Sequence, residues 1–220
     1  ADTDTDTDTD SDTDSDTDSD TDSDSDTDID FESLHSDLEH DTDPDSTEKE
    51  LIEMRFGNVE FGLNLFKVMA GGGSNLAISP FSIRSAFALL LAGAVGQTET
   101  DMSESLGYLD DPERTHTAMN YFKLALESRN LEPTEYLDEV IIKVTNQVFA
   151  CPANMMPIPE TYLDTIAVHY GLGIYLADFA GDPEGERQKI NQWVENQTFG
   201  RIVDLFPKKA INEITDFVLV

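Results

Sequence analysis

The residues whose types and spacing suggest a chemical role lie mainly in an acidic repeat at the start of the sequence. Aspartate occupies every even position from Asp2 to Asp30, and thirteen of the intervening positions are Thr or Ser. Carboxylates at this density along an extended chain would gather Ca²⁺ weakly and at many points. Each hydroxyl from Thr3 to Thr27 also has Asp one and three positions later, a spacing typical of sites for acidophilic kinases. Cation binding and modification are thus two candidate roles for the repeat, and neither is catalysis.

Elsewhere the chain offers no complete set of residues for catalysis. Four side chains with metal-ligand chemistry lie close together in the sequence: His35, Asp37, Glu39 and His40. Nothing in their segment would hold them in a fixed geometry, so we expect no metal site there. The run Gly71-Gly72-Gly73-Ser74 lacks the lysine that a phosphate-binding loop requires. We therefore expect neither an enzyme nor a bound cofactor.

The charge of the chain excludes several classes of partner. The 220 residues carry a formal net charge of −33, and residues 1–50 hold 23 acidic side chains against one basic residue, Lys49. Such a charge repels phosphate, so a nucleic-acid partner is excluded. The longest apolar run, Ala86 to Gly96, is shorter than the roughly 18–20 residues of a membrane span, so we expect no membrane partner.

The same imbalance divides the chain into two parts. Residues 1–46 are predicted to be a disordered acidic Thr/Ser-Asp arm, because no apolar burial offsets the entropy of ordering such a segment. Residues 47–220 are predicted to be a folded body. The sequence begins at Ala1 and stops within the apolar run Phe217–Val220, so we expect a processed chain or a fragment. A single cysteine, Cys151, can form no disulfide within this chain.

Hydrophobic periodicity in the body predicts helices mixed with strands, an α+β fold. The first helix begins with a capping box at Thr47 and carries one apolar stripe, formed by Ile52, Phe56, Val59, Leu63 and Phe66. Further helices are predicted over 80–94, 99–106, 114–128, 159–170 and from 183 onward, and strands over 75–79, 140–150, 174–179 and 216–220. His116 and His169 each stand alone on a predicted helix, where a hydrogen-bonded structural role is expected.

Several motifs in this body resemble those of one known family. Asn75-Leu-Ala-Ile-Ser79-Pro80-Phe-Ser82-Ile runs through an apolar helix into Gly93-Ala-Val-Gly-Gln-Thr98. Downstream follow Asn146-Gln-Val-Phe149, Ile190-Asn-Gln-Trp-Val-Glu-Asn-Gln-Thr-Phe-Gly-Arg-Ile202 and Phe217-Val-Leu-Val220. These segments, in this order, resemble the N-terminal half of the serpins. The resemblance implies a serpin-like fold with a large central β-sheet, present here as its N-terminal portion.

The resemblance also implies a function and a set of residues. Serpins inhibit serine proteases when a cleaved reactive loop inserts into the central sheet as an extra strand, and that loop would lie beyond this chain. In serpins the region where the strands part is called the shutter. By resemblance Asn75, Ser79, Pro80, Ser82 and Asn191 belong to it. The family also includes non-inhibitory members, so a non-inhibitory serpin whose arm binds calcium or another cation is the alternative.

The acidic arm resembles in placement the acidic N-terminal tail of heparin cofactor, and its end resembles the acid-Phe-acid ending of hirudin. We therefore expect the arm to steer a basic exosite of a thrombin-like protease toward the inhibitor, with Ile29, Asp30, Phe31, Glu32 and Leu34 as the contact residues. A solubilising spacer and weak Ca²⁺ binding are the competing roles. The resemblance implies a secreted, extracellular protein, in which the sequon at Asn196 would be a site for N-glycosylation.

Overall fold

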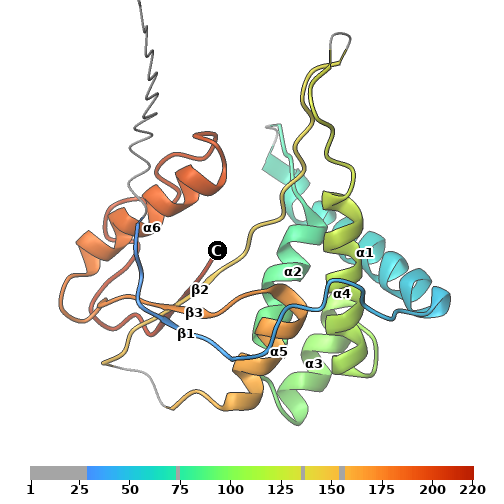
Figure 1. The fold of residues 1–220 in the computed structure, drawn as a ribbon, viewed down its shortest axis with the longest axis horizontal. Helices are drawn as coiled ribbons and strands as arrows, with labels where there is room; N and C mark the ends of the chain where they lie inside the picture. Colours follow the sequence, from blue (N-terminus) through green and yellow to red (C-terminus); the bar gives the residue numbers. More distant parts are fainter. Residues whose placement is uncertain (1–28, 73–74, 135–136, 154–156) are drawn as a thin grey trace, which may run out of the picture.

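A computed structural model describes residues 29–72, 75–134, 137–153 and 157–220. The predicted arm over residues 1–28 lies outside this part of the chain. The elements, in order, are β1 (Ser33–Leu34), α1 (Glu48–Met69), the 3-10 helix η1 (Ala70–Gly72), α2 (Pro80–Leu91), α3 (Gln97–Leu106), α4 (Pro112–Glu127), β2 (Val148–Ala150), α5 (Glu160–Tyr170), β3 (Ile174–Leu176), α6 (Pro183–Gln197) and β4 (Phe217–Leu219) (Figure 1). No described helix is long and apolar enough to cross a membrane.

The sheet has the strand order β1-β3-β2-β4. β2 and β3 are parallel, with Val148 opposite Ile174, whereas β1 and β4 each pair antiparallel with their neighbour. Successive side chains of a strand point to opposite faces of the sheet. Along β2 this alternation places Val148 and Ala150 in one buried cluster, and Phe149 and Cys151 in another.

The first cluster joins the sheet to the layer formed by α1 to α5, on one side of the sheet in Figure 1. Its centre contains the buried guanidinium of Arg84 in α2, which is 1% exposed. Arg84 donates hydrogen bonds to the carbonyl oxygens of Leu106 at 2.7 Å, Met54 at 3.1 Å and Gly107 at 2.7 Å. A buried cation is tolerated only when its donors are satisfied, and here one side chain joins α1, α2 and the end of α3.

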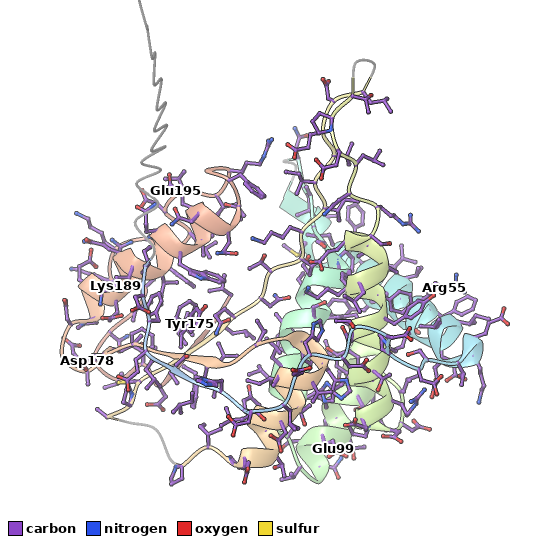
Figure 2. All side chains as sticks on the ribbon, viewed as in Figure 1. Arg55, Glu99, Tyr175, Asp178, Lys189 and Glu195 are labelled. Carbon is purple, nitrogen blue, oxygen red and sulfur yellow. The ribbon has the colours of Figure 1, made fainter. Side chains whose placement is uncertain are left out.

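The second cluster lies on the opposite face and is covered by α6. Ile190, Trp193 and Val194 of α6 are buried there, as the spacing of α6 predicts. Four aromatic rings meet on this face with centroids 5.1 to 6.3 Å apart: Phe31, Phe149, Tyr175 and Trp193. Figure 2 shows Tyr175 between the sheet and α6.

The predicted helices are present, but the strands are shorter than predicted. The strand expected over 75–79 is wrong. Those residues are irregular because no neighbouring strand pairs with them among the described residues, and Ser79 is the N-cap of α2. The long strand expected over 140–150 is limited to β2, preceded by an isolated bridge between Leu131 and Val140. A strand extends only as far as a partner satisfies its backbone groups.

The apolar stripe of α1 is correctly placed on one helix face, but that face is exposed in the described chain. Phe56 is 72% exposed and Leu63 is 56% exposed. The face of α1 that packs inward contains Met54, Gly57 and Gly62. An added Cβ at Gly57 would lie 2.0 Å from the Gly107 oxygen, and one at Gly62 would lie 2.6 Å from Pro80 Cγ. α1 therefore packs through close backbone approach, which glycine permits.

Residues 29–46 pack on the body, although the sequence predicts a disordered arm as far as residue 46. β1 pairs with β3, and the backbone N–H of Asp41 donates to the Val168 carbonyl at 2.9 Å. The described part of the predicted arm, residues 29–46, is therefore folded onto the body. Composition misled here because Phe31 and Leu34 supply apolar anchors to an otherwise acidic stretch.

Candidate functional site

The predicted shutter residues at the start of α2 form a helix cap. Ser79 is the N-cap residue; its Oγ accepts from the Ser82 backbone N–H at 3.3 Å and lies 2.8 Å from Ser82 Oγ. Pro80 stands at the first helical position, where its missing N–H is not needed. Ser79 and Asn75 are both exposed in the described chain.

Asn191 lies elsewhere, on α6. Its Nδ2 donates to the Phe206 carbonyl at 2.9 Å, and its Oδ1 accepts from the Phe206 backbone N–H at 2.8 Å. This pair of hydrogen bonds fixes the chain after α6 against the helix. Because α6 and α2 cover opposite faces of the sheet, the structure does not bring Asn191 together with Ser79 and Ser82 (Figure 1). Their common role in a shutter stays a prediction from resemblance.

The residues expected to contact a protease exosite are part of the fold. Phe31 is 8% exposed and belongs to the aromatic cluster on the α6 face. Leu34 lies in β1 and packs against the helical layer. Glu32 is exposed, but its backbone carbonyl accepts from the Leu176 N–H at 2.7 Å. In this arrangement the apolar residues of the set face the body and not a partner.

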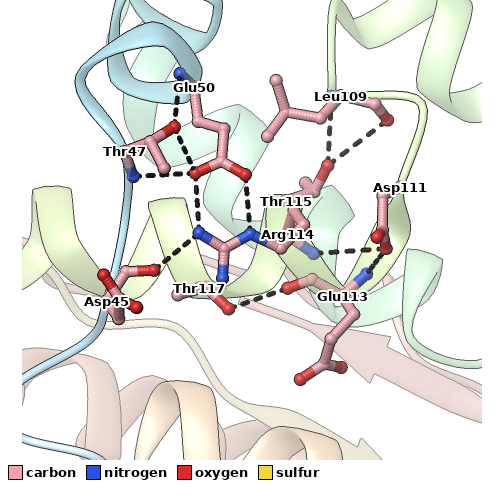
Figure 3. Close-up of polar contacts among 9 residues, drawn as sticks. All are labelled: Asp45, Thr47, Glu50, Leu109, Asp111, Glu113, Arg114, Thr115 and Thr117. Atoms are coloured by element: carbon pink, nitrogen blue, oxygen red, sulfur yellow. Dashed lines mark hydrogen bonds and ion pairs between the residues drawn. The ribbon is translucent and has the colours of Figure 1, made fainter.

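An ion pair next to the start of α1 fastens the N-terminal residues to α4. Arg114 donates through two nitrogens to the carboxylate of Glu50, each at 2.6 Å, and to the Asp45 carbonyl at 2.6 Å (Figure 3). Glu50 also closes the predicted capping box with Thr47. Hydrogen bonding from Arg114, supported by Thr47, lowers the pKa of Glu50 from 4.5 to about 2. The sequence identified the cap, but not the partner from α4.

Two histidines that stand alone in the sequence meet in the structure. His116 of α4 and His169 of α5 are buried, and their ring centroids lie 5.8 Å apart. His116 Nδ1 lies 2.7 Å from the Tyr170 hydroxyl, and His169 Nε2 lies 2.9 Å from Glu113 Oε1. Burial, followed by the neighbouring His169, lowers the pKa of His116 from 6.5 to about 3. His116 is therefore uncharged at neutral pH, and the two rings with their hydrogen bonds join α4 to α5.

The residues with metal-ligand chemistry do not assemble. His40 Nε2 lies 3.0 Å from Asn120 Oδ1, whereas His35, Asp37 and Glu39 are exposed. Among the described residues there is no group of three or more His, Cys, Asp or Glu side chains that could hold a metal ion.

The outer edge of the sheet at β4 is open in the described part of the chain. Within the described residues β4 is the terminal strand of the sheet, paired only with β2. Its Phe217 is 48% exposed, and an apolar groove of about 610 Å³ lies beside it, lined by residues such as Leu90, Tyr162 and Leu219. Further strand pairing at this edge would bury apolar surface and satisfy open backbone groups.

Comparisons with known proteins agree with this architecture. A family model described as "Serpin (serine protease inhibitor)" matches residues 56–220. Antithrombin-III from Bos taurus is 32% identical over 180 residues, which cover 80% of this chain and 38% of the relative. Leukocyte elastase inhibitor from Sus scrofa is 31% identical over 170 residues, covering 76% of this chain and 42% of the relative.

Solved structures are similar in fold. Human kallistatin aligns with a TM-score of 0.64 at 22% identity, and human thyroxine-binding globulin with 0.63 at 24% identity; each alignment covers 77% of this chain and 44% of the other. The chain thus spans about two-fifths of the length of the proteins it matches. With the family model covering most of the body, the chain belongs to the serpin family.

Proposed function

We propose that this protein is a serine-protease inhibitor of the serpin type, which acts by cleavage of a reactive loop and insertion of that loop into the central sheet. The observation that carries the proposal is the match of residues 56–220 to the family described as serine protease inhibitors. The relatives named antithrombin-III and leukocyte elastase inhibitor support a protease as the partner. In this proposal the reactive loop lies beyond Val220.

The sheet edge supports this mechanism. β4 has a free edge within the described chain, and the adjoining apolar groove would gain burial from an added strand. Loop insertion stabilises the cleaved inhibitor by completing such a sheet, so the energy that traps the protease comes from strand pairing and apolar burial.

The proposal is tested with the protein extended by the sequence that follows Val220. Incubation with a trypsin-like protease should give a covalent complex that survives a denaturing gel. Cleavage of the inhibitor without such a complex would instead favour a non-inhibitory serpin.

We further propose that the acidic repeat over residues 1–28 raises the rate of encounter with a basic protease surface. Because Phe31 and Leu34 are packed on the body, the carboxylates alone would supply this effect, and only 1–28 should be deleted to test it. The deletion should lower the association rate about tenfold or more at low ionic strength and much less at high ionic strength. Equal rates at both salt concentrations would contradict steering.

Calcium binding is the second candidate role of the repeat, favoured by aspartate at alternate positions from Asp2 to Asp30. Calorimetry with millimolar Ca²⁺ tests it on the same pair of chains, with and without residues 1–28. Heat that disappears with the deletion supports calcium binding, and absence of heat from both chains contradicts it.

We also propose that the protein is secreted and glycosylated at Asn196, whose side chain is exposed near the end of α6. A mass decrease on treatment with a glycosidase, absent from the Asn196→Gln variant, tests this modification.

A further inference from the structure

The edge of the sheet opposite β4 is already occupied by a segment of the same chain. Residues 29–36, which we call the edge segment, run beside β3 in Figure 1. Ser33 pairs with Tyr175 and Leu34 with Ile174 in antiparallel register, and the Leu176 N–H donates to the Glu32 carbonyl at 2.7 Å. The backbone contact is that of one strand added to a sheet edge.

A ring-sized niche beside this edge receives one side chain of the segment. The Phe31 ring stacks on Tyr175 with centroids 5.3 Å apart and meets Phe149 edge to face at 5.1 Å. Trp193 of α6 packs edge to face against both Tyr175 and Phe149, and so forms the back of the niche. Stacked and edge-to-face rings attract beyond their apolar burial, so this position selects an aromatic residue.

The opposite face of the segment is recognised by a different surface. Leu34, three residues after Phe31, packs against the cluster of the helical layer. Of the two residues between these anchors, Glu32 is exposed, so its side chain is free to vary. The edge and its two faces therefore fit an extended peptide with an aromatic residue followed three positions later by an aliphatic one.

The turn between α5 and β3 is shaped for this approach. An added Cβ at Gly173 would lie 2.6 Å from the Leu34 carbonyl oxygen and 3.2 Å from His35 Cβ. Glycine alone leaves room for another backbone at this position. Gly173 therefore admits the backbone of the edge segment beside β3.

The edge segment is held separately from the residues that follow it. Ser36 Oγ donates to Asp164 Oδ1 at 2.5 Å, and the next attachment is His40 to Asn120. Between them residues 37–39 are exposed, and the Leu38 side chain is 52% exposed. The strand contacts and the contacts near α4 are therefore joined by an accessible link.

We propose that the edge of β3, with the niche formed by Phe149, Tyr175 and Trp193, is a peptide-binding site, and that residues 29–36 are its intramolecular ligand. Cleavage within residues 37–39 converts this ligand into a separate peptide, which the site continues to bind and can exchange for another peptide of the same pattern. The proposal concerns the edge opposite β4 and is independent of protease inhibition.

The test uses the complete chain with a recognition sequence for a site-specific protease inserted after Leu38. After cleavage, the nicked protein should take up a fluorescein-labelled peptide spanning Asp28–Ser36, detected as a rise in fluorescence anisotropy. Trp193, the single tryptophan of the chain, should report the same exchange by its emission. Uncleaved protein should bind the peptide far more weakly, because the tethered segment competes at high effective concentration.

Matched peptides distinguish recognition from nonspecific adhesion. Phe31→Ala in the peptide should weaken binding at least tenfold through loss of the buried ring, whereas Glu32→Gln should leave it within about twofold. On the protein side Gly173→Ala should abolish uptake, with circular dichroism showing that the helices remain. Two results would overturn the proposal: equal binding of the Phe31→Ala and Glu32→Gln peptides, or loss of the folded signal when the cleaved segment leaves.

Discussion

The layer of helices α1 to α5 and the packing of α6 on the sheet are held together in different ways. Within the layer of α1 to α5, buried polar groups join the helices to one another: Arg84 donates to three backbone carbonyls, and His116 is hydrogen-bonded to Tyr170. On the face covered by α6, aromatic rings fill the interface, and Phe31 from the edge segment is one of them. Buried polar groups must keep their partners and some of them titrate, whereas ring packing depends on apolar contact, so the two regions should respond differently to mutation and to pH.

The largest expected effect is at Arg84. Replacing it in Arg84→Met should lower the free energy of unfolding by about 4 kcal/mol, because the Leu106, Met54 and Gly107 carbonyls lose their buried donor. Urea unfolding followed by circular dichroism measures the loss. Arg84→Lys keeps the charge but not the planar guanidinium, so its free energy of unfolding should lie between those of wild type and Arg84→Met. A loss below about 1 kcal/mol in Arg84→Met would contradict the stabilising role of buried polar contacts within the layer of α1 to α5.

The second largest effect is expected when acid weakens the layer of α1 to α5. Since the pKa of His116 is about 3 in the folded chain against an ordinary 6.5, its contribution is fully present above pH 6.5 and is lost as the pH falls toward 3. By pH 4 the loss amounts to about 3 kcal/mol. His116→Gln should remove this part of the pH dependence, which urea midpoints at pH 7, 5.5 and 4 would show. Parallel curves for both proteins would exclude His116 as the source.

The aromatic face should respond weakly to pH. Trp193→Phe removes part of a ring system that contacts Phe149 and Tyr175, and should cost about 1.5 kcal/mol of unfolding free energy. Because the replaced Trp193 and the new Phe both lack an ionisable group, the difference from wild type should be the same at pH 7 and pH 4.5. A difference that grows in acid would show that the two faces are not energetically distinct.

The smallest effect is expected at the ion pair between α1 and α4. Glu50→Gln should cost about 1 kcal/mol at pH 7, since the pair is near solvent and screened. The folded pKa of Glu50 is about 2 against an ordinary 4.5, so its contribution is present above pH 4.5 and is lost as the pH falls toward 2. Wild type and Glu50→Gln should therefore differ at pH 7 and converge near pH 2. Addition of 1 M NaCl at pH 7 should also reduce the difference.

The helices and the family could be predicted from the sequence because both depend on local signals. The predicted capping box at Thr47 is formed within one turn of the chain. The family motifs likewise consist of contiguous residues. The surroundings of the predicted shutter and exosite residues could not be predicted in this way. Asn191 does not meet Ser79, and Phe31 is buried. The residues around each of them come from distant segments of the chain.

The apolar stripe of α1 is a second case in which the sequence predicts a helix but not its packing. Its spacing predicts a helix with one apolar face, and the helix is present. The face that packs inward carries Met54, which is 1% exposed, together with Gly57 and Gly62, whose missing side chains allow close contact with Gly107 and Pro80. Close packing of backbones depends on a surface of matching shape, which no periodicity reveals.

The sequence alone determined the mixed helix and strand content, the strongly acidic start of the chain and the serpin resemblance, since each follows from composition or from neighbouring residues. Only the tertiary structure decided that Arg84 is a buried junction, that His116 and His169 form a pair, and that residues 29–36 complete one edge of the sheet. The physical reason is that burial and partnership join side chains from separate elements, and these contacts exist only after the chain has folded.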